Sequence, residues 1–201
     1  MIKSVNKEEI LNKFLEKYAG NKWDEEFDHI GEIYINNKNA ITEDLKSKFA
    51  SVCKLGIYLQ EQGLKGEIKY IYFSLLRTSL LENKGEFRID LYDERWFLDK
   101  LECSVNINLD FIYTSFFKHM EDLKEKKKEH ARSITDMEIE EIMLQESNVY
   151  HILTVEFFRN FIDELLLVTS FKELKKCEEM KIMAGEFMDA ADLIYTKEEI
   201  I

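Results

Sequence analysis

The run from Gly66 to Ile107 constrains the fold more than any other stretch of the chain. Its polar segment 82–85, ENKG, separates two runs rich in β-branched, aromatic and leucine residues, which is the pattern of a β-hairpin. Apolar and polar side chains then alternate cleanly over residues 101–107. The sequence therefore predicts a three-stranded antiparallel meander over about 67–107. A helix from Glu67 to Leu81 is the competing interpretation.

The apolar side chains also predict a register for this hairpin. If Leu81 lies opposite Glu86, the two strands share one apolar face, and Arg77 faces Asp90 on the other. A slip of one residue would mix the faces. The predicted core side chains of the hairpin are Leu76, Leu80, Phe87, Ile89 and Leu91.

Helices are expected on both sides of the meander, within 6–63 and within 109–195, because the chain has no proline and only 7 glycines. In the first region Asn6 and Thr42 are predicted N-caps, and an alternating stretch at 32–36 could add a fourth, edge strand.

In the second region a helix follows Asn108, and a capping box at 135–138, TDME, begins another. That helix would run to about Lys175, with a break near Ser147 or near Thr169. A last helix is predicted over 178–195. The predicted fold is thus α+β and mostly helical, as one domain over 1–201.

Composition narrows the classes of partner. The net charge of −12 argues against nucleic acid and would attract a basic partner. The simpler interpretation is that this acidity only keeps a cytosolic protein soluble. Three widely spaced cysteines are expected to be reduced, and the longest apolar run, Leu165–Val168, is far too short to span a membrane. With no signal-peptide pattern at the start of the sequence, we expect a cytoplasmic protein that is not bound to membranes.

Charged and aromatic residues of the meander form the first candidate site, which is either a binding site for a small acidic ligand or a structural ion-pair network. The network is the favoured interpretation. Three further residues are candidates for contact with a protein partner. One belongs to an aromatic and apolar trio that is otherwise a plug of the core, and two belong to an acidic ridge that is otherwise only solvated. The cluster comprises Arg77, Arg88, Asp90, Tyr92 and Asp93, and the partner-binding candidates are Trp96, Glu186 and Asp189.

No metal, cofactor or catalytic site is predicted. Glu26 and His29 have the E-x-x-H spacing of carboxylate-bridged metal sites, but such sites use the motif twice and no second copy is present. Phosphate-binding glycine loops, G-x-S-x-G and C-x-x-C are also absent from the sequence.

Three phrases, SLLRTSLL at 74–81, RIDLYDE at 88–94 and GEFMD at 185–189 followed by IY at 194–195, resemble a group of small uncharacterised bacterial proteins. The resemblance covers roughly residues 64–195 and implies no reaction. As a type, an acidic protein of this kind is similar to the immunity proteins of bacterial toxin systems, although no motif carries that analogy.

The sequence thus favours a non-enzymatic protein that binds a basic partner, such as a toxin domain. The alternative is a small-molecule-binding or enzymatic domain that uses the arginine and aspartate cluster. Homodimerisation would be indicated by an exposed apolar stripe over residues 149–171.

Overall fold

A computed structural model describes residues 7–18, 23–130 and 133–196 of the 201-residue chain. The chain divides into two compact units, one formed by Met1–Asn36 with Phe111–Tyr150 and the other by Asn37–Asp110 with His151–Ile201. The fold is α+β and mostly helical, as predicted. That the whole chain acts as one domain stays a prediction.

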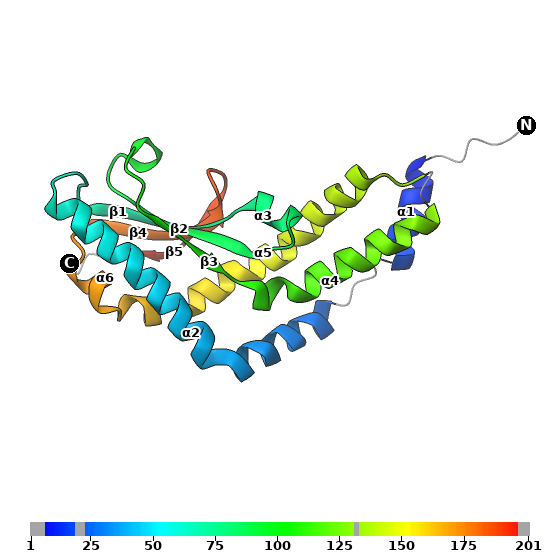
Figure 1. Cartoon of the computed structure of the whole chain (residues 1–201), viewed down its shortest axis with the longest axis horizontal. Coiled ribbons are helices and arrows are strands. Elements are labelled where there is room, and N and C mark those ends of the chain that lie inside the picture. The colour runs from blue at the N-terminus through cyan, green and yellow to red at the C-terminus, as the bar shows by residue number, and fades with distance from the viewer. Residues whose placement is uncertain (1–6, 19–22, 131–132, 197–201) are drawn as a thin grey trace, which may run out of the picture. The chain divides into compact units, whose positions relative to one another are not determined.

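Six α-helices, two short 3₁₀ segments and five strands make up the described residues (Figure 1). In chain order they are α1 (Lys7–Tyr18), α2 (Trp23–Glu61), β1 (Ile68–Leu75), α3 (Arg77–Leu81), β2 (Glu86–Tyr92), η1 (Trp96–Leu98), β3 (Ser104–Asn108), α4 (Asp110–Lys127), η2 (Lys128–His130), α5 (Asp136–Leu166), α6 (Thr169–Glu173), β4 (Lys176–Glu186) and β5 (Ala191–Thr196).

The second unit is built on a mixed sheet with the strand order β3-β2-β1-β4-β5. Antiparallel pairing joins β1 to β2 and β2 to β3, whereas β1 and β4 are parallel and β4 forms an antiparallel hairpin with β5. The sheet is therefore larger than the predicted meander, and its central strand is β1.

The predicted last helix over 178–195 is wrong, because this segment forms β4 and β5. Its apolar residues fit both periods, and the buried side chains of Met180, Ile182 and Ala184 follow the period of a strand. Gly185 permits the hairpin, since a Cβ there would lie 2.2 Å from the carbonyl oxygen of Ala190.

The predicted strand over 32–36 is also wrong, because α2 runs through it without a break for 39 residues. No proline interrupts this segment, and asparagine in a helix interior costs only about 0.7 kcal/mol relative to alanine. Thr42 consequently lies inside α2 and does not cap a helix. Asn6, the other predicted cap, lies outside the described residues.

The predicted hairpin register is wrong by five residues. Leu91 pairs with Ile71, where the sequence analysis placed Leu76, because residues 77–81 form α3 instead of continuing the strand. The hydroxyl of Ser79 closes this short helix by donating to the carbonyl oxygens of Leu76 at 2.6 Å and Lys84 at 3.0 Å. Arg77 therefore does not face Asp90, whose cross-strand partner is Tyr72.

Two local predictions for the helices are confirmed. At the capping box, the backbone N–H of Thr135 donates to Glu138 at 2.7 Å and the N–H of Glu138 donates back to the Thr135 hydroxyl at 3.3 Å. The long helix breaks near Thr169, since α5 ends at Leu166 and α6 begins at Thr169.

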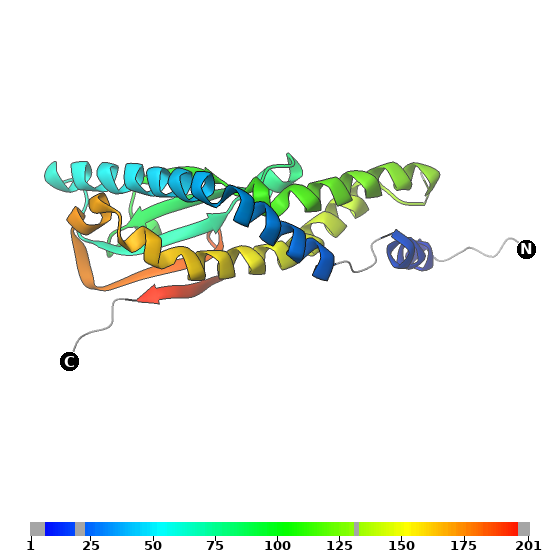
Figure 2. The same ribbon diagram turned by 90° about the horizontal axis from the view of Figure 1, so that it is seen from below.

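Within the second unit, α2, α5 and α6 run along one face of the sheet (Figure 2). Aromatic side chains fill the space between them: the Phe73 ring centroid lies 4.6 Å from that of Phe158 and 6.3 Å from that of Phe49, and Phe49 packs on Phe171. Among the described residues of this unit, the opposite side of the sheet carries no α-helix and is covered in part by the short 3₁₀ segment η1. We call it the helix-free face.

Paired residues of neighbouring strands share a face, so the register defines the helix-free face directly. Its members on β1 and β2 are Tyr70, Tyr72, Ser74, Arg88, Asp90 and Tyr92, and on β4 and β5 they include Met183 and Leu193. Of the predicted hairpin core residues, Leu80, Phe87, Ile89 and Leu91 are buried, and Leu76 is only half-buried.

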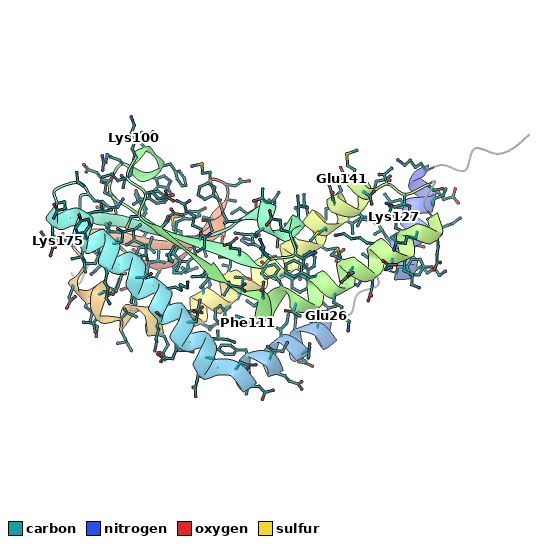
Figure 3. All side chains as sticks on the ribbon, viewed as in Figure 1. Glu26, Lys100, Phe111, Lys127, Glu141 and Lys175 are labelled. Carbon is teal, nitrogen blue, oxygen red and sulfur yellow. The ribbon has the colours of Figure 1, made fainter. Side chains whose placement is uncertain are left out.

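The first unit packs a smaller aromatic core. Tyr150 of α5 lies against Phe116 and Tyr113 of α4, with ring centroids 4.9 Å and 5.9 Å apart, and Tyr34 of α2 stacks on Phe111. The side chains of this unit are drawn in Figure 3, where Glu26, Phe111, Lys127 and Glu141 are labelled.

Most apolar side chains over residues 149–171 are buried, including those of Tyr150, Phe158 and Leu165. The stripe that would have indicated homodimerisation is thus largely used within the chain. Among the described residues, no helix is long and apolar enough to cross a membrane.

Candidate functional site

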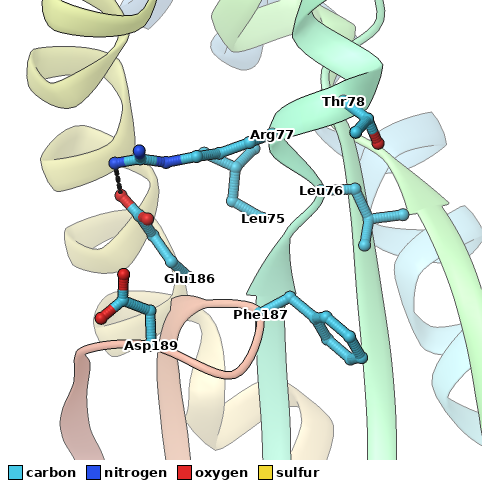
Figure 4. Close-up of a pocket in the computed structure, with 7 residues that line it drawn as sticks. All are labelled: Leu75, Leu76, Arg77, Thr78, Glu186, Phe187 and Asp189. Atoms are coloured by element: carbon cyan, nitrogen blue, oxygen red, sulfur yellow. Dashed lines mark hydrogen bonds and ion pairs between the residues drawn. The ribbon is translucent and has the colours of Figure 1, made fainter.

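A pocket of about 280 Å³ lies where β1 and β4 end side by side. Because these two strands are parallel, their carboxyl ends meet at the same edge of the sheet, which is the usual place for ligands in such sheets. The pocket is lined by Leu75, Leu76, Arg77, Thr78, Glu186, Phe187 and Asp189. We call it the strand-end pocket (Figure 4).

An ion pair spans the strand-end pocket. Arg77, the first residue of α3, donates from Nη2 to Glu186 Oε1 at 2.5 Å, and Glu186 is the last residue of β4. The Arg77 side chain is 50% exposed and that of Glu186 is 15% exposed. Because the arginine end of this pair is half-exposed, solvent screens the interaction and Arg77 can change partners at low cost.

Tyr72 holds two backbone carbonyl groups of the β4–β5 turn through hydrogen bonds. Its hydroxyl, which lies on the helix-free face, donates to the carbonyl oxygens of Glu186 at 3.0 Å and Asp189 at 3.3 Å. Burial and the neighbouring charges of Asp189 and Glu186 raise the pKa of Tyr72 to about 12.

The side chains of the strand-end pocket separate into a charged side and an apolar side. Figure 4 shows Arg77, Glu186 and Asp189 together on one side, with Leu76 and Phe187 extending to the other. The ring of Phe187 lies 5.5 Å below the guanidinium of Arg88, which connects this pocket to the helix-free face.

Arg88 and Asp90 form a second, separate ion pair on β2. Arg88 Nε lies 2.9 Å from both carboxylate oxygens of Asp90, and Nη2 lies 2.7 Å from Oδ1. Burial raises the pKa of Asp90, against the opposing effect of Arg88 and of the nearby Tyr92 hydroxyl. Arg88 also reaches the exposed Glu102 at 3.2 Å.

Asp93 belongs to a third arrangement, which we call the loop network and which holds the loop after β2. Arg95 donates from Nε and Nη2 to the Asp93 carboxylate at 3.0 Å and 2.5 Å, and from Nη2 to Asp99 at 3.2 Å. Lys65 donates to Asp99 and, at 3.0 Å, to the carbonyl oxygen of Leu101. The side chains of Lys65 and Asp99 are fully buried.

Trp96 lies in the same loop, against the helix-free face. Its ring centroid is 3.6 Å from that of Tyr70 and 5.2 Å from that of Phe97, which in turn packs on Tyr92. The backbone of Trp96 has φ +53°, which is uncommon for a bulky residue. Trp96 is half-buried, and Lys100 projects from the end of this loop (Figure 3).

The structure therefore divides the predicted cluster among three places: Arg77 in the strand-end pocket, Arg88 with Asp90 and Tyr92 on β2, and Asp93 in the loop network. The register error explains this, because Arg77 lies beyond the end of β1. Glu186 and Asp189, predicted on a helix, instead meet Arg77 at the strand-end pocket.

Sequence reasoning missed Phe187, Lys65 and Asp99. Phe187 lies in the segment that is predicted as the last helix, and the Lys65–Asp99 pair joins residues 34 positions apart. No local spacing signals such a pair, so only the fold could reveal it.

A second pocket, of about 540 Å³, lies in the first unit. It is lined by Glu26, His29, Thr114, Ser115, Lys118, His119 and Asp122, so it includes both residues of the E-x-x-H motif. Tyr150 donates from its hydroxyl to Glu26. Within the described ranges, no group of three histidine, cysteine or acidic side chains is placed to hold a metal ion.

The three cysteines are free thiols. Burial raises the pKa of Cys53 to about 12 and that of Cys103 to about 11, so neither thiol is activated as a nucleophile.

No protein-family model matches the sequence, and no match is found among curated proteins or solved structures. The resemblance carried by the three sequence phrases accordingly stays a prediction.

Proposed function

We propose that the protein is a non-enzymatic binding protein that receives a basic partner on the helix-free face. The observation that carries the proposal is a group of exposed apolar side chains around that face. Leu98 is 80% exposed, Met188 is 62% exposed and Leu193 is 45% exposed. Exposed apolar side chains that share one side of a sheet are the material of protein-binding surfaces.

These residues come from different segments and still belong to one side of the sheet. Leu193 pairs with Met183, which pairs with Tyr72 on the helix-free face. Leu98 directly follows Trp96 and Phe97, whose rings pack on Tyr72 of the same face. Met188 directly follows Phe187, whose ring lies against the guanidinium of Arg88. We call Trp96, Leu98, Phe187, Met188 and Leu193 the apolar patch.

Backbone strain supports the same surface. Trp96 and Met188 both have positive φ, at +53° and +57°, a conformation that is uncommon for residues other than glycine. Strained residues of this kind are concentrated at binding and catalytic sites. Strain at two members of the apolar patch therefore favours a functional role for it.

Charge indicates the kind of partner. The chain carries −12 in total, and exposed carboxylates at Glu94, Glu102 and Asp189 lie in the segments around the apolar patch. Acidic side chains at the rim of an interface accelerate association with a basic protein, whereas the apolar centre supplies affinity. The most concrete form of the proposal is an inhibitor that covers a basic toxin domain.

The internal ion pairs also favour binding over catalysis. Asp90 and Asp93 each form paired hydrogen bonds with an arginine and are almost fully buried, which is typical of structural carboxylates. On this basis we assign them to the scaffold.

The proposal is tested by co-purification with the product of the neighbouring gene, using single substitutions on the apolar patch. Met188→Glu and Leu98→Glu are expected to weaken the complex at least tenfold, because each buries a charge at the interface centre. Leu167→Glu is the matched control, since Leu167 is 63% exposed but lies between α5 and α6, away from the patch. Equal binding by all three variants would overturn the proposal.

A second candidate function is small-molecule binding, which the strand-end pocket favours through its position at the carboxyl ends of parallel strands. Of the arginine and aspartate cluster predicted from the sequence, only Arg77 lines this pocket, so the ligand would bind to a different set of residues. In this case Arg77→Gln abolishes ligand-induced stabilisation with the fold retained, and a screen of small metabolites by thermal shift is the direct test.

A further inference from the structure

We infer that the strand-end pocket receives a basic side chain, arginine or lysine, that anchors the partner. This inference rests on the proposed function and adds the chemistry of one contact. It is argued from the charges, the walls and the rigidity of the pocket.

The charged side chains of the strand-end pocket sum to one net negative charge. Arg77 carries one positive charge, whereas Glu186 and Asp189 carry two negative charges on the same side of the pocket (Figure 4). Arg77 is bonded to Glu186, and the carboxylate of Asp189 is exposed. A guanidinium or ammonium group beside Asp189 would balance the count, whereas an anion would meet a net negative charge.

Histidine does not supply the missing charge. Burial lowers the pKa of His151 of α5, whose ring also interacts electrostatically with Glu186, Arg77 and Asp192. A histidine with a lowered pKa carries little positive charge at pH 7. Asp192 adds a further negative charge near the same group. The surroundings of the strand-end pocket therefore favour a cation.

The walls of the pocket suit the rest of a basic side chain. Leu76 and Phe187 form an apolar side next to the charged one, and Thr78 adds a hydroxyl (Figure 4). Arginine and lysine bind in this way, with the methylene stem on apolar surface and the charged end at a carboxylate. A small anion would make no use of these walls.

The turn that carries Asp189 is held in place before any ligand arrives. The Tyr72 hydroxyl donates to the carbonyl oxygens of Glu186 and Asp189. The N–H of Ala190 donates to Asp189 Oδ1 at 2.9 Å, and Gly185 allows close contact between β4 and β5. A site that is already formed loses less conformational entropy when it binds.

The probe for this inference is N-acetyl-arginine methylamide, titrated into the isotope-labelled protein and followed by NMR. A ligand of this size is expected to bind with a Kd on the order of millimolar. Saturable shifts should appear at residues 76–78 and 186–190. The citrulline equivalent, which has the same shape without the charge, should produce none.

Asp189→Asn is the informative variant. Asparagine keeps a carbonyl oxygen for the Ala190 N–H and removes only the charge, so the fold should be retained, which circular dichroism and the thermal midpoint verify. We expect Asp189→Asn to weaken the arginine probe at least fivefold. Asp192→Asn removes the same charge from the second residue of β5 and is the matched control. It should weaken binding of the arginine probe less than Asp189→Asn does.

The inference is overturned if the arginine probe gives no saturable shift, if citrulline shifts the same residues, or if Asp189→Asn leaves binding unchanged. Its failure is separable from that of the proposed function. A complex with the neighbouring gene's product that is lost in Met188→Glu but unaffected by Asp189→Asn would keep the apolar patch as the interface and remove the anchor.

Discussion

The loop network and the strand-end pocket each contain an arginine that is about half-exposed, Arg95 at 48% and Arg77 at 50%, yet they differ in the burial of the other charged groups and in the number of bonds formed. In the loop network, Lys65 and Asp99 have fully buried side chains, and the lysine has two acceptors. In the strand-end pocket, Arg77 donates to one carboxylate among the described residues, that of Glu186, which is 15% exposed. The comparison teaches that satisfied, buried charge fixes a loop, whereas exposed charge with one partner is available to a ligand.

The largest expected effect is the loss of a buried cation from the loop network. Lys65→Met leaves Asp99 buried with a weaker set of donors, so we expect the free energy of unfolding to fall by about 3–5 kcal/mol. Urea denaturation measures it. Lys100→Met, an exposed lysine in the same loop, is the control and should be within about 0.5 kcal/mol of the wild type. A similar small loss in Lys65→Met would show that the network is not structural.

Acid should reveal the loop network through Asp93. Hydrogen bonds from Arg95 hold the pKa of Asp93 at about 2, below its usual 3.8. Because the folded pKa is the lower one, the contribution of Asp93 is complete above about pH 4 and is lost as the pH falls towards 2.

The corresponding measurement is the difference in unfolding free energy between the wild type and Asp93→Asn from pH 7 down to 2. We expect this difference to shrink by about 2 kcal/mol over the interval below pH 4. A difference that is constant with pH would contradict the assignment of Asp93 to the loop network.

The Arg88–Asp90 pair is intermediate between the two regions, since Asp90 is buried and Arg88 is 25% exposed. Asp90→Asn should cost about 1–2 kcal/mol of stability, because the arginine can turn towards solvent and Glu102. Glu102→Gln, which alters the exposed partner of the same arginine, should cost about 0.5 kcal/mol or less. If Asp90→Asn keeps its stability and loses partner binding, Asp90 belongs to a site.

The smallest effect on stability is expected at the strand-end pocket. Glu186→Gln breaks the pair with Arg77 and should change the unfolding free energy by about 1 kcal/mol or less. A double-mutant cycle with Arg77→Gln measures the coupling directly. A coupling above about 2 kcal/mol would place this pair with the structural ones and remove the contrast.

Sequence reasoning succeeded where the signal was local. The capping box at Thr135 and Glu138, the helix after Asn108 and the break near Thr169 all follow from residues a few positions apart. It failed where distant segments decide the structure. The pattern of residues 178–195 fits a helix as well as a strand, and only the free edge of β1 selects the strand.

The candidate site shows the same division. Arg77, Glu186 and Asp189 were all identified from the sequence, but they were assigned to two different sites. The five-residue insertion of α3 moves Arg77 out of the meander and to the end of β4. No pattern within residues 67–107 contains that information.

The parallel pairing of β1 with β4 has a consequence for how the chain folds. Ile71 must remain unpaired on one side until Ile182, which lies more than a hundred residues later in the chain, has been synthesised. Pairings so distant in sequence form slowly, and an exposed apolar strand edge invites pairing with another chain. A nascent chain stopped before residue 176 should therefore aggregate through β1, whereas the complete sheet covers that edge with its last two strands.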